Sequence, residues 1–445
     1  MRNNLLKASL GALVASALLA CPPPPGACDT SGTGSIVLTF SGLPEGVTPK
    51  VTLQGPSAQT VTMAQTLMVG SGNWAVSAEL ATAADPIVRT AYAGRVSAPN
   101  FCLEPGTTQA VDVAFSKVPT SNRLWVGNGS GGTGNLHGFD STALQAAGMT
   151  PSSWSADVAA SRSPTFDRVG NLWAIGATTS DPQLGRLPAA DFATGTTARP
   201  DRRARISGLS CIPALATLAF DRQGNLAAGS ACQKEVYLLS AASLETATGT
   251  SDVTLTPALT LSGFQSVDGL AFDAAGNLYV ADAAAEQVVR YDASALAGSA
   301  PMPSVRLKVR RNTMPADTSA FGPRSLAFDA TGNLWSFDFG ANVLFFIPQA
   351  ELSGSGTRSV QPGVRVAVAV GAVLEGLAFD EAGGLWVPYA AGQLARFSPE
   401  QLTVSTGAGA PTQPERIVRG STLGSTLDPA FFPAPKSLPL FHALP

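Results

Sequence analysis

The chain of 445 residues repeats one short pattern five times: two apolar runs flank an Asp, two variable residues and Gly-Asn or Gly-Gly. The Phe before each Asp recurs at steps of 54, 52, 56 and 51 residues, and Phe432 lies one further step along in a degraded copy. The five are Phe166, Phe220, Phe272, Phe328 and Phe379. Repeats of this length are typical of β-propellers, in which each repeat forms one four-stranded sheet.

The polar residues of each copy predict a β-hairpin. An Asp side chain can accept hydrogen bonds from its own backbone, and Gly tolerates positive φ. No copy carries the additional oxygen ligands of an EF-hand-type calcium loop. We therefore interpret the recurring Asp as turn residues and not as calcium ligands. They are Asp167, Asp221, Asp273, Asp329 and Asp380.

A second repeat follows each hairpin and occurs six times, beginning at residues 139, 187, 239, 291, 347 and 397. FDSTAL and IPQAEL are examples, and each copy predicts a third strand that ends in one helical turn, with Ser, Asp or Pro near its start. A fourth strand then often opens with Pro and carries an Arg, at 303–307, 362–366 and 414–418. Pro and an outward charge predict an exposed edge strand.

Six such units predict an all-β fold, a six-bladed β-propeller over residues 118–445. The first unit has an apparent second strand at 123–126 but lacks a good strand before it, whereas the C-terminus has a surplus one near Phe431 and Phe432. We predict that this C-terminal strand completes the first blade. The alternative is that Val111 to Phe115 does so.

Residues 32–116 have a different sequence pattern from the propeller repeats: short stretches of alternating apolar and polar residues, which predict strands, are separated by Gly, Pro, Ser and Asn. They predict a small β-sandwich of immunoglobulin-like or transthyretin-like type.

The N-terminus predicts export. Arg2 and Lys7 precede an uncharged stretch from Ala8 to Ala20, which is too short to span a bilayer and suits the core of a signal peptide at residues 1–20. It ends in Leu-Leu-Ala-Cys, which resembles the lipobox of bacterial lipoproteins and implies a lipid on Cys21; an ordinary secretory signal is the alternative. Residues 21–31 would form a Pro-rich tether. We expect a lipid-anchored protein of the cell envelope, periplasmic or surface-exposed.

The four remaining cysteines form an even set, as expected of an oxidising compartment. Cys211 and Cys232 flank one predicted hairpin almost symmetrically about its turn, so they are predicted to pair. Cys28 with Cys102 then follows by elimination, and a Cys28 to Cys211 link would overturn this assignment.

Two resemblances add to this interpretation. GSIVLTFSGLPEG and GNWAVSA, in the N-terminal domain, resemble PEGA-type or carboxypeptidase-regulatory-like modules of bacterial surface proteins, which implies a spacer or adhesion role. The segment from Ser266 to Asp292 resembles an NHL repeat and also the senescence-marker-protein or gluconolactonase-like family. Both are six-bladed propellers, and the likeness covers roughly residues 121 to 445. The shared residues build hairpins, so they imply fold more than function.

Candidate site residues are the variable positions four before each Phe, which should face the mouth of the central channel. They are Arg162, Ala216, Asp268, Arg324, Glu375 and Asp428. In the gluconolactonase-like family a Glu, two Asn and an Asp hold a divalent metal there. Asp268 and Glu375 match two of these ligands, but Arg162 and Ala216 would replace the Asn pair, and an Arg contradicts a metal site.

Charge pairing is the simpler interpretation, because Arg324 lies between Asp268 and Glu375 in blade order and Arg162 lies beside Asp428. The arginines could alternatively bind a small anion or a sugar-like ligand.

Other chemistry finds little support. The net charge of −3 without a basic cluster argues against nucleic acid. His137 and His442 are outside any motif and are expected in surface or loop positions, and the repeated Trp residues are expected to pack the blades.

We predict a monomeric, non-enzymatic binding or scaffolding module without a cofactor. Its partner is expected to be a small molecule or a protein that binds at the propeller face. The alternative is a metal-dependent lactonase or related hydrolase using Asp268 and Glu375.

Overall fold

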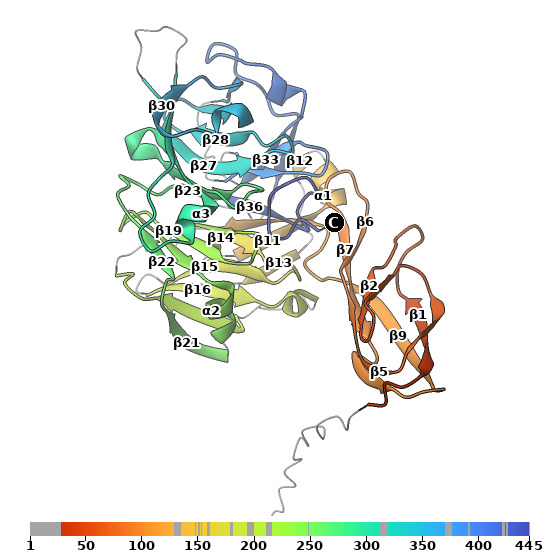
Figure 1. Ribbon diagram of the computed structural model, residues 1–445. Coiled ribbons are helices and arrows are strands. Elements are labelled where there is room, and N and C mark those ends of the chain that lie inside the picture. Colours follow the sequence, from red (N-terminus) through yellow and green to blue (C-terminus); the bar gives the residue numbers. More distant parts are fainter. Residues whose placement is uncertain are drawn as a thin grey trace, which may run out of the picture. The chain divides into compact units, whose positions relative to one another are not determined.

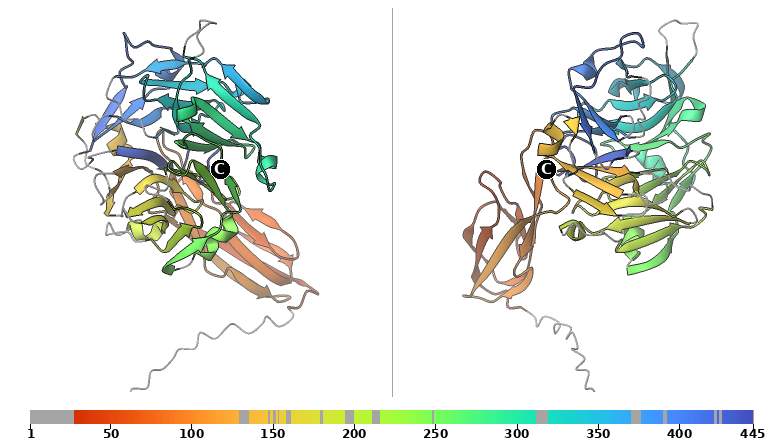
Figure 2. Two further views of the ribbon diagram at one scale, coloured as in Figure 1. Left: turned by 90° about the vertical axis from the view of Figure 1, so that its left-hand side faces the viewer. Right: turned by 180° about the vertical axis from the view of Figure 1, so that it is seen from behind.

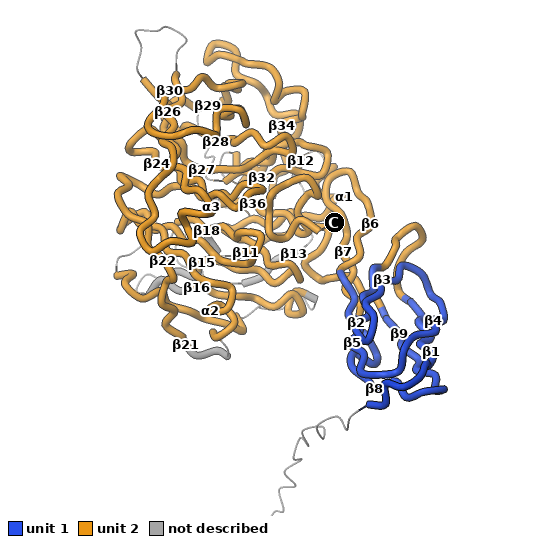
Figure 3. The backbone as a smooth tube through the Cα atoms, viewed as in Figure 1, with its two compact units in different colours: residues 1–41, 50–79, 95–114 blue, residues 42–49, 80–94, 115–445 orange. Residues whose placement is uncertain are grey.

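The computed structural model of the protein describes residues 28–128, 135–146, 148–149, 152, 154–157, 161–178, 181–193, 200–210, 216–247, 249–311, 319–369, 376–389, 392–420, 423 and 426–444. The chain divides into two compact units, drawn in blue and orange in Figure 3. Unit 1 comprises residues 1–41, 50–79 and 95–114, and unit 2 comprises 42–49, 80–94 and 115–445. Two short segments of the predicted N-terminal domain therefore group with the propeller residues.

Unit 1 is built on two sheets. In the first, β1 (Thr33–Ser41) pairs antiparallel with β4 (Gln65–Gly70) and parallel with β9 (Thr108–Lys117). The second has the order β3 (Gln59–Val61), β2 (Val51–Gln54), β5 (Gly72–Ala78) and β8 (Asn100–Leu103). Burial alternates along β1 and β5, so each of these strands turns one face to the interior. Because β9 pairs with β1, Val111 to Phe115 does not close the propeller.

Unit 2 contains six sheets among its described residues, numbered here as blades 1 to 6 and shown in Figure 1 from yellow through green to blue. From the innermost strand outward, blade 1 has β36 (Thr426–Phe432), β10 (Arg123–Asn128), β11 (Asn135–Asp140) and β13 (Trp154–Asp157). Blade 2 has β14 (Ser161–Phe166), β15 (Leu172–Thr178), β16 (Asp181–Leu187) and β17 (Arg202–Ile206). Blade 3 has β18 (Thr217–Phe220), β19 (Leu226–Ser230), β20 (Glu235–Leu239) and β22 (Leu259–Leu261). Blade 4 has β23 (Gly269–Phe272), β24 (Leu278–Asp282), β25 (Gln287–Tyr291) and β26 (Val305–Val309). Blade 5 has β27 (Pro323–Phe328), β28 (Leu334–Asp338), β29 (Val343–Ile347) and β31 (Arg365–Ala367). Blade 6 has β32 (Ala378–Phe379), β33 (Leu385–Pro388), β34 (Gln393–Phe397) and β35 (Arg416–Arg419).

The ring closes as the sequence predicts. Strand β36, at the C-terminal end of the chain, pairs antiparallel with β10, with Phe431 opposite Leu124 and Phe432 opposite Arg123. In Figures 1 and 2 this dark blue strand lies beside the strands of blade 1. The prediction of an all-β, six-bladed propeller is confirmed.

Three blades carry an additional outer strand that the sequence did not reveal. β21 (Gly249–Leu255) pairs parallel with β17 in blade 2, β30 (Gly356–Val360) with β26 in blade 4, and β12 (Gly148–Met149) with β35 in blade 6. Each additional strand comes from the following blade, so blades 2 and 3, 4 and 5, and 6 and 1 are linked in pairs. The predicted exposed edges at 303–307 and 414–418 are therefore wrong, because β26 and β35 are covered. β31, which overlaps the predicted edge at 362–366, has no further strand beside it, but residues 405–412 cover its outer side: the N–H of Thr406 donates to the carbonyl oxygen of Arg365 and that of Thr412 to the carbonyl oxygen of Ala367, both at 2.8 Å.

The six predicted helical turns are confirmed. They are α1 (Ser141–Gln145), η1 (Ala189–Ala193), α2 (Ala241–Thr246), α3 (Ala293–Leu296), η3 (Gln349–Glu351) and η4 (Gln401–Thr403), with a further turn η2 (Ala283–Ala285) after β24. The Asp140 and Ser240 side chains cap α1 and α2 by accepting from backbone N–H groups.

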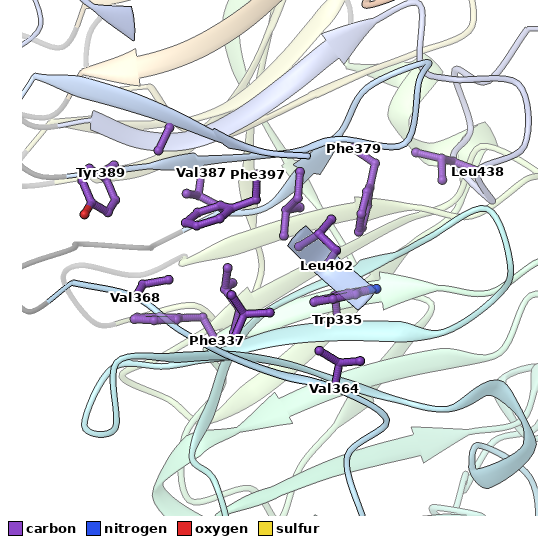
Figure 4. Close-up of a cluster of buried hydrophobic side chains, with 14 residues drawn as sticks. Trp335, Phe337, Val364, Val368, Phe379, Val387, Tyr389, Phe397, Leu402 and Leu438 are labelled. Carbon is purple, nitrogen blue, oxygen red and sulfur yellow. The ribbon is translucent and has the colours of Figure 1, made fainter. Parts of the chain in front are cut away.

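Hydrophobic side chains fill the space between neighbouring blades. Figure 4 shows the cluster between blades 5 and 6, where Trp335 and Phe337 face Val387 and Phe397. Such burial contributes about 25 cal/mol per Å² of apolar surface removed from water, so blade contacts dominate the stability of the ring. The Trp residues at the repeated position, Trp125, Trp173, Trp335 and Trp386, are at most 3% exposed, which confirms that they pack the blades.

The turn interpretation of the repeated Asp is also confirmed. In blade 4, Asp273 accepts hydrogen bonds from the backbone N–H groups of Ala275 and Asn277, both at 2.9 Å, and from Nδ2 of Asn277 at 2.7 Å. Oδ1 of Asn277 in turn accepts from the N–H of Ala293, at the start of α3. The turn Gly, Gly276, has a φ of 84°, a conformation that Gly adopts without strain.

A hairpin before the propeller also belongs to unit 2. β6 (Ala81–Ala83) pairs antiparallel with β7 (Thr90–Val96), and between them Ile87 and Val88 are buried in a cluster that includes Leu124 and Trp386, from blades 1 and 6. The segment therefore covers the seam at which the ring closes.

Candidate functional site

A cavity of about 140 Å³ lies along the central channel of unit 2. The inner strands of all six blades line it, because each inner strand runs along the axis of the ring. Four leucines at one repeated position supply much of its wall: Leu218, Leu270, Leu326 and Leu377. Apolar walls with a few polar groups are typical of small-molecule sites.

The predicted ring of charges is only partly present around this cavity. Asp268, one residue before β23 of blade 4, and Asp428, in β36 of blade 1, both line it. Arg324 is exposed, and its Cζ lies 5.2 Å from the ring centroid of Phe339. Glu375 lies outside the described residues. Arg162 lies in β14, but its side chain is not described.

The predicted pairing of Arg324 with Asp268 is not formed. Strand β27 shifts register between Pro323 and Leu326, which is a β-bulge. A bulge changes the direction of the side chains on its strand, and here Arg324 contacts the exposed ring of Phe339 and is not among the residues that line the cavity. This contact is a cation–π interaction. Glu375, the other expected partner of Arg324, lies outside the described residues.

Asp268 is half-buried and is held by neutral donors. Its Oδ2 accepts from Oγ of Ser266 at 2.5 Å and from the backbone N–H of Ala283 at 3.2 Å. Ser266 also donates its backbone N–H to Oδ1 of Asp282 at 2.8 Å. Asp282 is fully buried and therefore fixes the loop that carries Asp268.

Asp282 and Asp338 are functional positions that the sequence reasoning missed. Both end the second strand of their blade, ten residues after the repeated Phe, and both are buried. Asp338 accepts from Arg311 at 2.9 Å and from the N–H of Gly322 at 2.8 Å. Each carboxylate thus supports the loop before an inner strand. The recurrence of Asp at the same position in blades 4 and 5 was the available signal.

Small residues follow the charged positions and set the width of the channel. A Cβ at Gly269 would lie 2.4 Å from the carbonyl oxygen of Arg324 and 2.9 Å from Cα of Ser325, so the inner strands of blades 4 and 5 touch at this point. Ser325 is 6% exposed, lines the cavity and has an Oγ without a hydrogen-bond partner among the described residues. Ser163, which accepts from the N–H of Leu218 at 2.9 Å, lines the blade 2 side.

The C-terminal segment contributes one end of the cavity, through Pro435, Leu438, Pro439, Leu440, Phe441 and His442. His442 is 4% exposed, and its ring lies against those of Phe166 and Phe432. Burial lowers its pKa to about 4. His137 is also buried, 1% exposed, and burial lowers its pKa. The expectation of a surface or loop position is therefore wrong for His137, which is buried in strand β11. His442 lies in a turn, as expected, but is buried there.

The cysteines agree with the predicted pairing where they are described. Cys28 and Cys102 form a disulfide with Cα atoms 5.8 Å apart. Cys232 is disulfide-bonded, and its predicted partner Cys211 lies outside the described residues, as does Cys21.

Within the described ranges, the side chains close enough to hold a metal are those of Cys28, Cys102 and Glu104, but a disulfide occupies both sulfurs. No helix in the described part is long and apolar enough to cross a membrane.

The strand order defines the protein as a six-bladed β-propeller. The solved structures to which the chain is similar have the following TM-scores, all below 0.5, so the fold rests on the strand order alone. A streptogramin B lyase is 11% identical, with a TM-score of 0.36, and the similarity covers 54% of this chain and 66% of that one, which is just under two thirds. The propeller domain of Swd1 from Myceliophteria thermophila is 15% identical, with a TM-score of 0.37 and coverage of 58% and 69%. A chain of a nidogen/laminin complex is 12% identical, with a TM-score of 0.40 and coverage of 69% and 97%. No protein-family model and no curated protein matches the chain.

Proposed function

We propose that the protein is a lipid-anchored component of the cell envelope whose propeller acts as a non-enzymatic binding module. The ligand site of this proposal is the channel cavity. The observation that carries it is the cavity of about 140 Å³, with leucine walls and a half-buried carboxylate and a buried hydroxyl among its lining groups. An apolar wall supplies affinity, and the few polar groups orient the ligand.

The size of the cavity indicates the size of the ligand. An apolar cavity of roughly 150 Å³ accommodates a benzene-sized molecule. Because the C-terminal segment contributes one end, we expect a ligand to enter from the other, where Asp268 and Asp428 line the cavity near the starts of their inner strands.

A cavity-filling variant tests this site. Leu326 is partly exposed and lines the cavity, so Leu326→Trp should occupy the space that a ligand needs. We expect the parent protein to bind benzyl alcohol, a neutral probe of suitable size, in isothermal titration calorimetry, and the variant to lose this binding. Met302→Trp, at a site that is 76% exposed and is not part of the cavity lining, is the matched control. Equal binding by parent and Leu326→Trp would refute the site.

The envelope location rests on residues 1–20, on the lipobox-like end at Cys21 and on the disulfides of Cys28, Cys102 and Cys232, which favour an oxidising compartment. Cys21→Ser should abolish lipid attachment, measured as the mass of the N-terminal peptide and as partition into detergent. A Cys21→Ser protein that still carries lipid would contradict the anchor.

A metal-dependent lactonase or related hydrolase at the channel mouth is the second candidate, and the observation in its favour is that Asp268 lines the cavity. Calcium and zinc affinities of the parent protein and of Asp268→Ala decide between the two. Tight uptake that is lost in the variant would favour the hydrolase. No uptake by the parent would remove it.

A further inference from the structure

Asp268 is held by neutral donors alone, as the fully buried Asp282 is, but unlike Asp282 it lines the cavity. Several other described carboxylates of unit 2 face an arginine. Asp338 faces Arg311, Asp380 faces Arg396 and Glu381 faces Arg89, each within hydrogen-bond distance. Asp268 instead receives a hydroxyl and a backbone N–H, and no cation lies beside it among the described residues. A carboxylate has about four lone-pair sites, so the two neutral donors leave acceptor sites on Asp268 that a ligand could use.

A second observation points to a ligand next to this carboxylate. The Oγ of Ser325 is buried without a partner, although buried polar atoms in proteins are nearly always hydrogen-bonded. The close contact between Gly269 and Ser325 places Ser325 against the residue that follows Asp268. Asp268 and Ser325 both belong to the lining of the same cavity.

Much of the remaining wall is apolar, although Asp428, Thr165 and Thr217 also line the cavity. Beyond Asp268 and Ser325 the cavity continues between Leu270, Leu326 and Leu377, toward the C-terminal segment. A ligand that satisfies both parts therefore has one cationic or strongly donating end and an apolar body.

We propose that the channel takes a small organic cation, a primary ammonium on an apolar body about the size of one aromatic ring. The ammonium donates to the carboxylate of Asp268 and to Oγ of Ser325, because it has three donors and no acceptor. The body lies against the leucines. Asp282 acts as a positioning residue, since it holds the loop that carries Ser266 and Asp268. This inference rests on the proposed function, which makes the same cavity the binding site.

An anion fits this part of the wall less well. The carboxylate of Asp268 belongs to the described lining, whereas Arg324 contacts Phe339 and is not among the described lining residues. A carboxylate ligand beside Asp268 would face a like charge, which costs free energy in a partly desolvated site.

Three probes of one shape test the charge preference by calorimetry at pH 7: benzylamine, benzyl alcohol and benzoate. We expect the parent to bind benzylamine at least tenfold more tightly than benzyl alcohol and to reject benzoate. Asp268→Asn keeps the shape of the side chain and removes its charge, so it should remove the preference for benzylamine. Ser325→Ala should weaken benzylamine binding several-fold. Glu45→Gln removes an exposed carboxylate that is not part of the lining and should change nothing.

The outcomes separate the two proposals. If benzylamine and benzyl alcohol bind equally in the parent, the inference about the cation is wrong, while the channel remains a binding site. If no probe binds, the channel site itself fails and the inference with it. Should Asp268→Asn fold poorly in thermal melts, the salt dependence of the parent decides: benzylamine binding must weaken with added salt and benzyl alcohol binding must not.

Discussion

The guanidinium of Arg396 lies against Gly384, where the other four hairpin turns carry an Asn side chain. A Cβ at Gly384 would lie 2.3 Å from a terminal nitrogen of Arg396. Nε of Arg396 donates to Oδ2 of Asp380 at 2.7 Å, the oxygen that the Asn amide reaches in the other turns, as Asn277 reaches Oδ2 of Asp273. Arg396 also pairs with Glu415. In blade 6 the guanidinium of Arg396 therefore takes the place of the Asn amide as the hydrogen-bond donor to Oδ2 of Asp380.

Restoring the consensus residue in this blade should therefore destabilise it. Gly384→Asn forces a side chain into the space of Arg396, and we expect the free energy of unfolding to fall by about 1–3 kcal/mol. Arg396→Ala removes the side chain that the new Asn would meet. The double variant Gly384→Asn/Arg396→Ala should therefore lose less free energy of unfolding than the sum of the losses of the two single variants. Urea unfolding of the four proteins measures the coupling. Strict additivity would contradict this relationship.

Acid should weaken the propeller through His442. The ordinary His pKa is 6.5, and burial lowers that of His442 to about 4 in the folded protein. Above pH 6.5 the folded and unfolded forms are both neutral, and the full stability is present. Between pH 6.5 and 4 only the unfolded chain binds the proton, so stability falls by about 3 kcal/mol over this range. Urea unfolding at several pH values should show this loss, and His442→Phe should reduce the slope. An unchanged slope in the variant would show that His442 is not the cause.

Arg89 should be important for ring closure. Its side chain is 2% exposed, and it donates to Glu381 at 3.1 Å and to the carbonyl oxygens of Ala434 at 2.8 Å and Leu444 at 3.1 Å. It thereby connects the hairpin before the propeller to blade 6 and to the C-terminal segment. Arg89→Met removes one partner of a buried ion pair, which costs about 3–5 kcal/mol. Lys50→Met removes a cation from the exposed pair with Glu79 and should cost less than about 1 kcal/mol. Denaturant unfolding compares the two.

Hydrogen exchange should reveal the paired blades. In blades 2, 4 and 6 the fourth strands β17, β26 and β35 have a partner on both sides, whereas β13 and β22 are the edges of blades 1 and 3 among the described strands. Amides of the covered strands should exchange more slowly than those of the edges. Equal exchange in the two groups would mean that β21, β30 and β12 do not pair stably.

The sequence determined most of the propeller because its signal is repeated. Each hairpin turn, helical turn and packing Trp occurs several times, so errors at one copy are corrected by the others. The additional strands are different: β21, β30 and β12 carry no repeated motif, and their parallel pairing connects segments far apart in the chain. Periodicity therefore predicted the blades but not the links between them.

The site was less predictable because single positions decide it. Counting four residues back from each Phe identified Asp268 and Asp428, but the count assumes a regular strand. The register shift in β27 changes the direction of Arg324 and exposes it, and one inserted residue is not visible in the spacing of the repeat. The burial of His442 depends on the folding of the C-terminal segment against the ring, which no local pattern indicates.

A crystal structure of the protein grown with benzylamine tests the central claim most directly. The account predicts density for the probe in the channel cavity, with its nitrogen at hydrogen-bond distance from Asp268 and Ser325 and its ring against Leu270 and Leu326. In crystals of Leu326→Trp, the account predicts no density for the probe. A channel without the probe under conditions where calorimetry shows binding would contradict the claim.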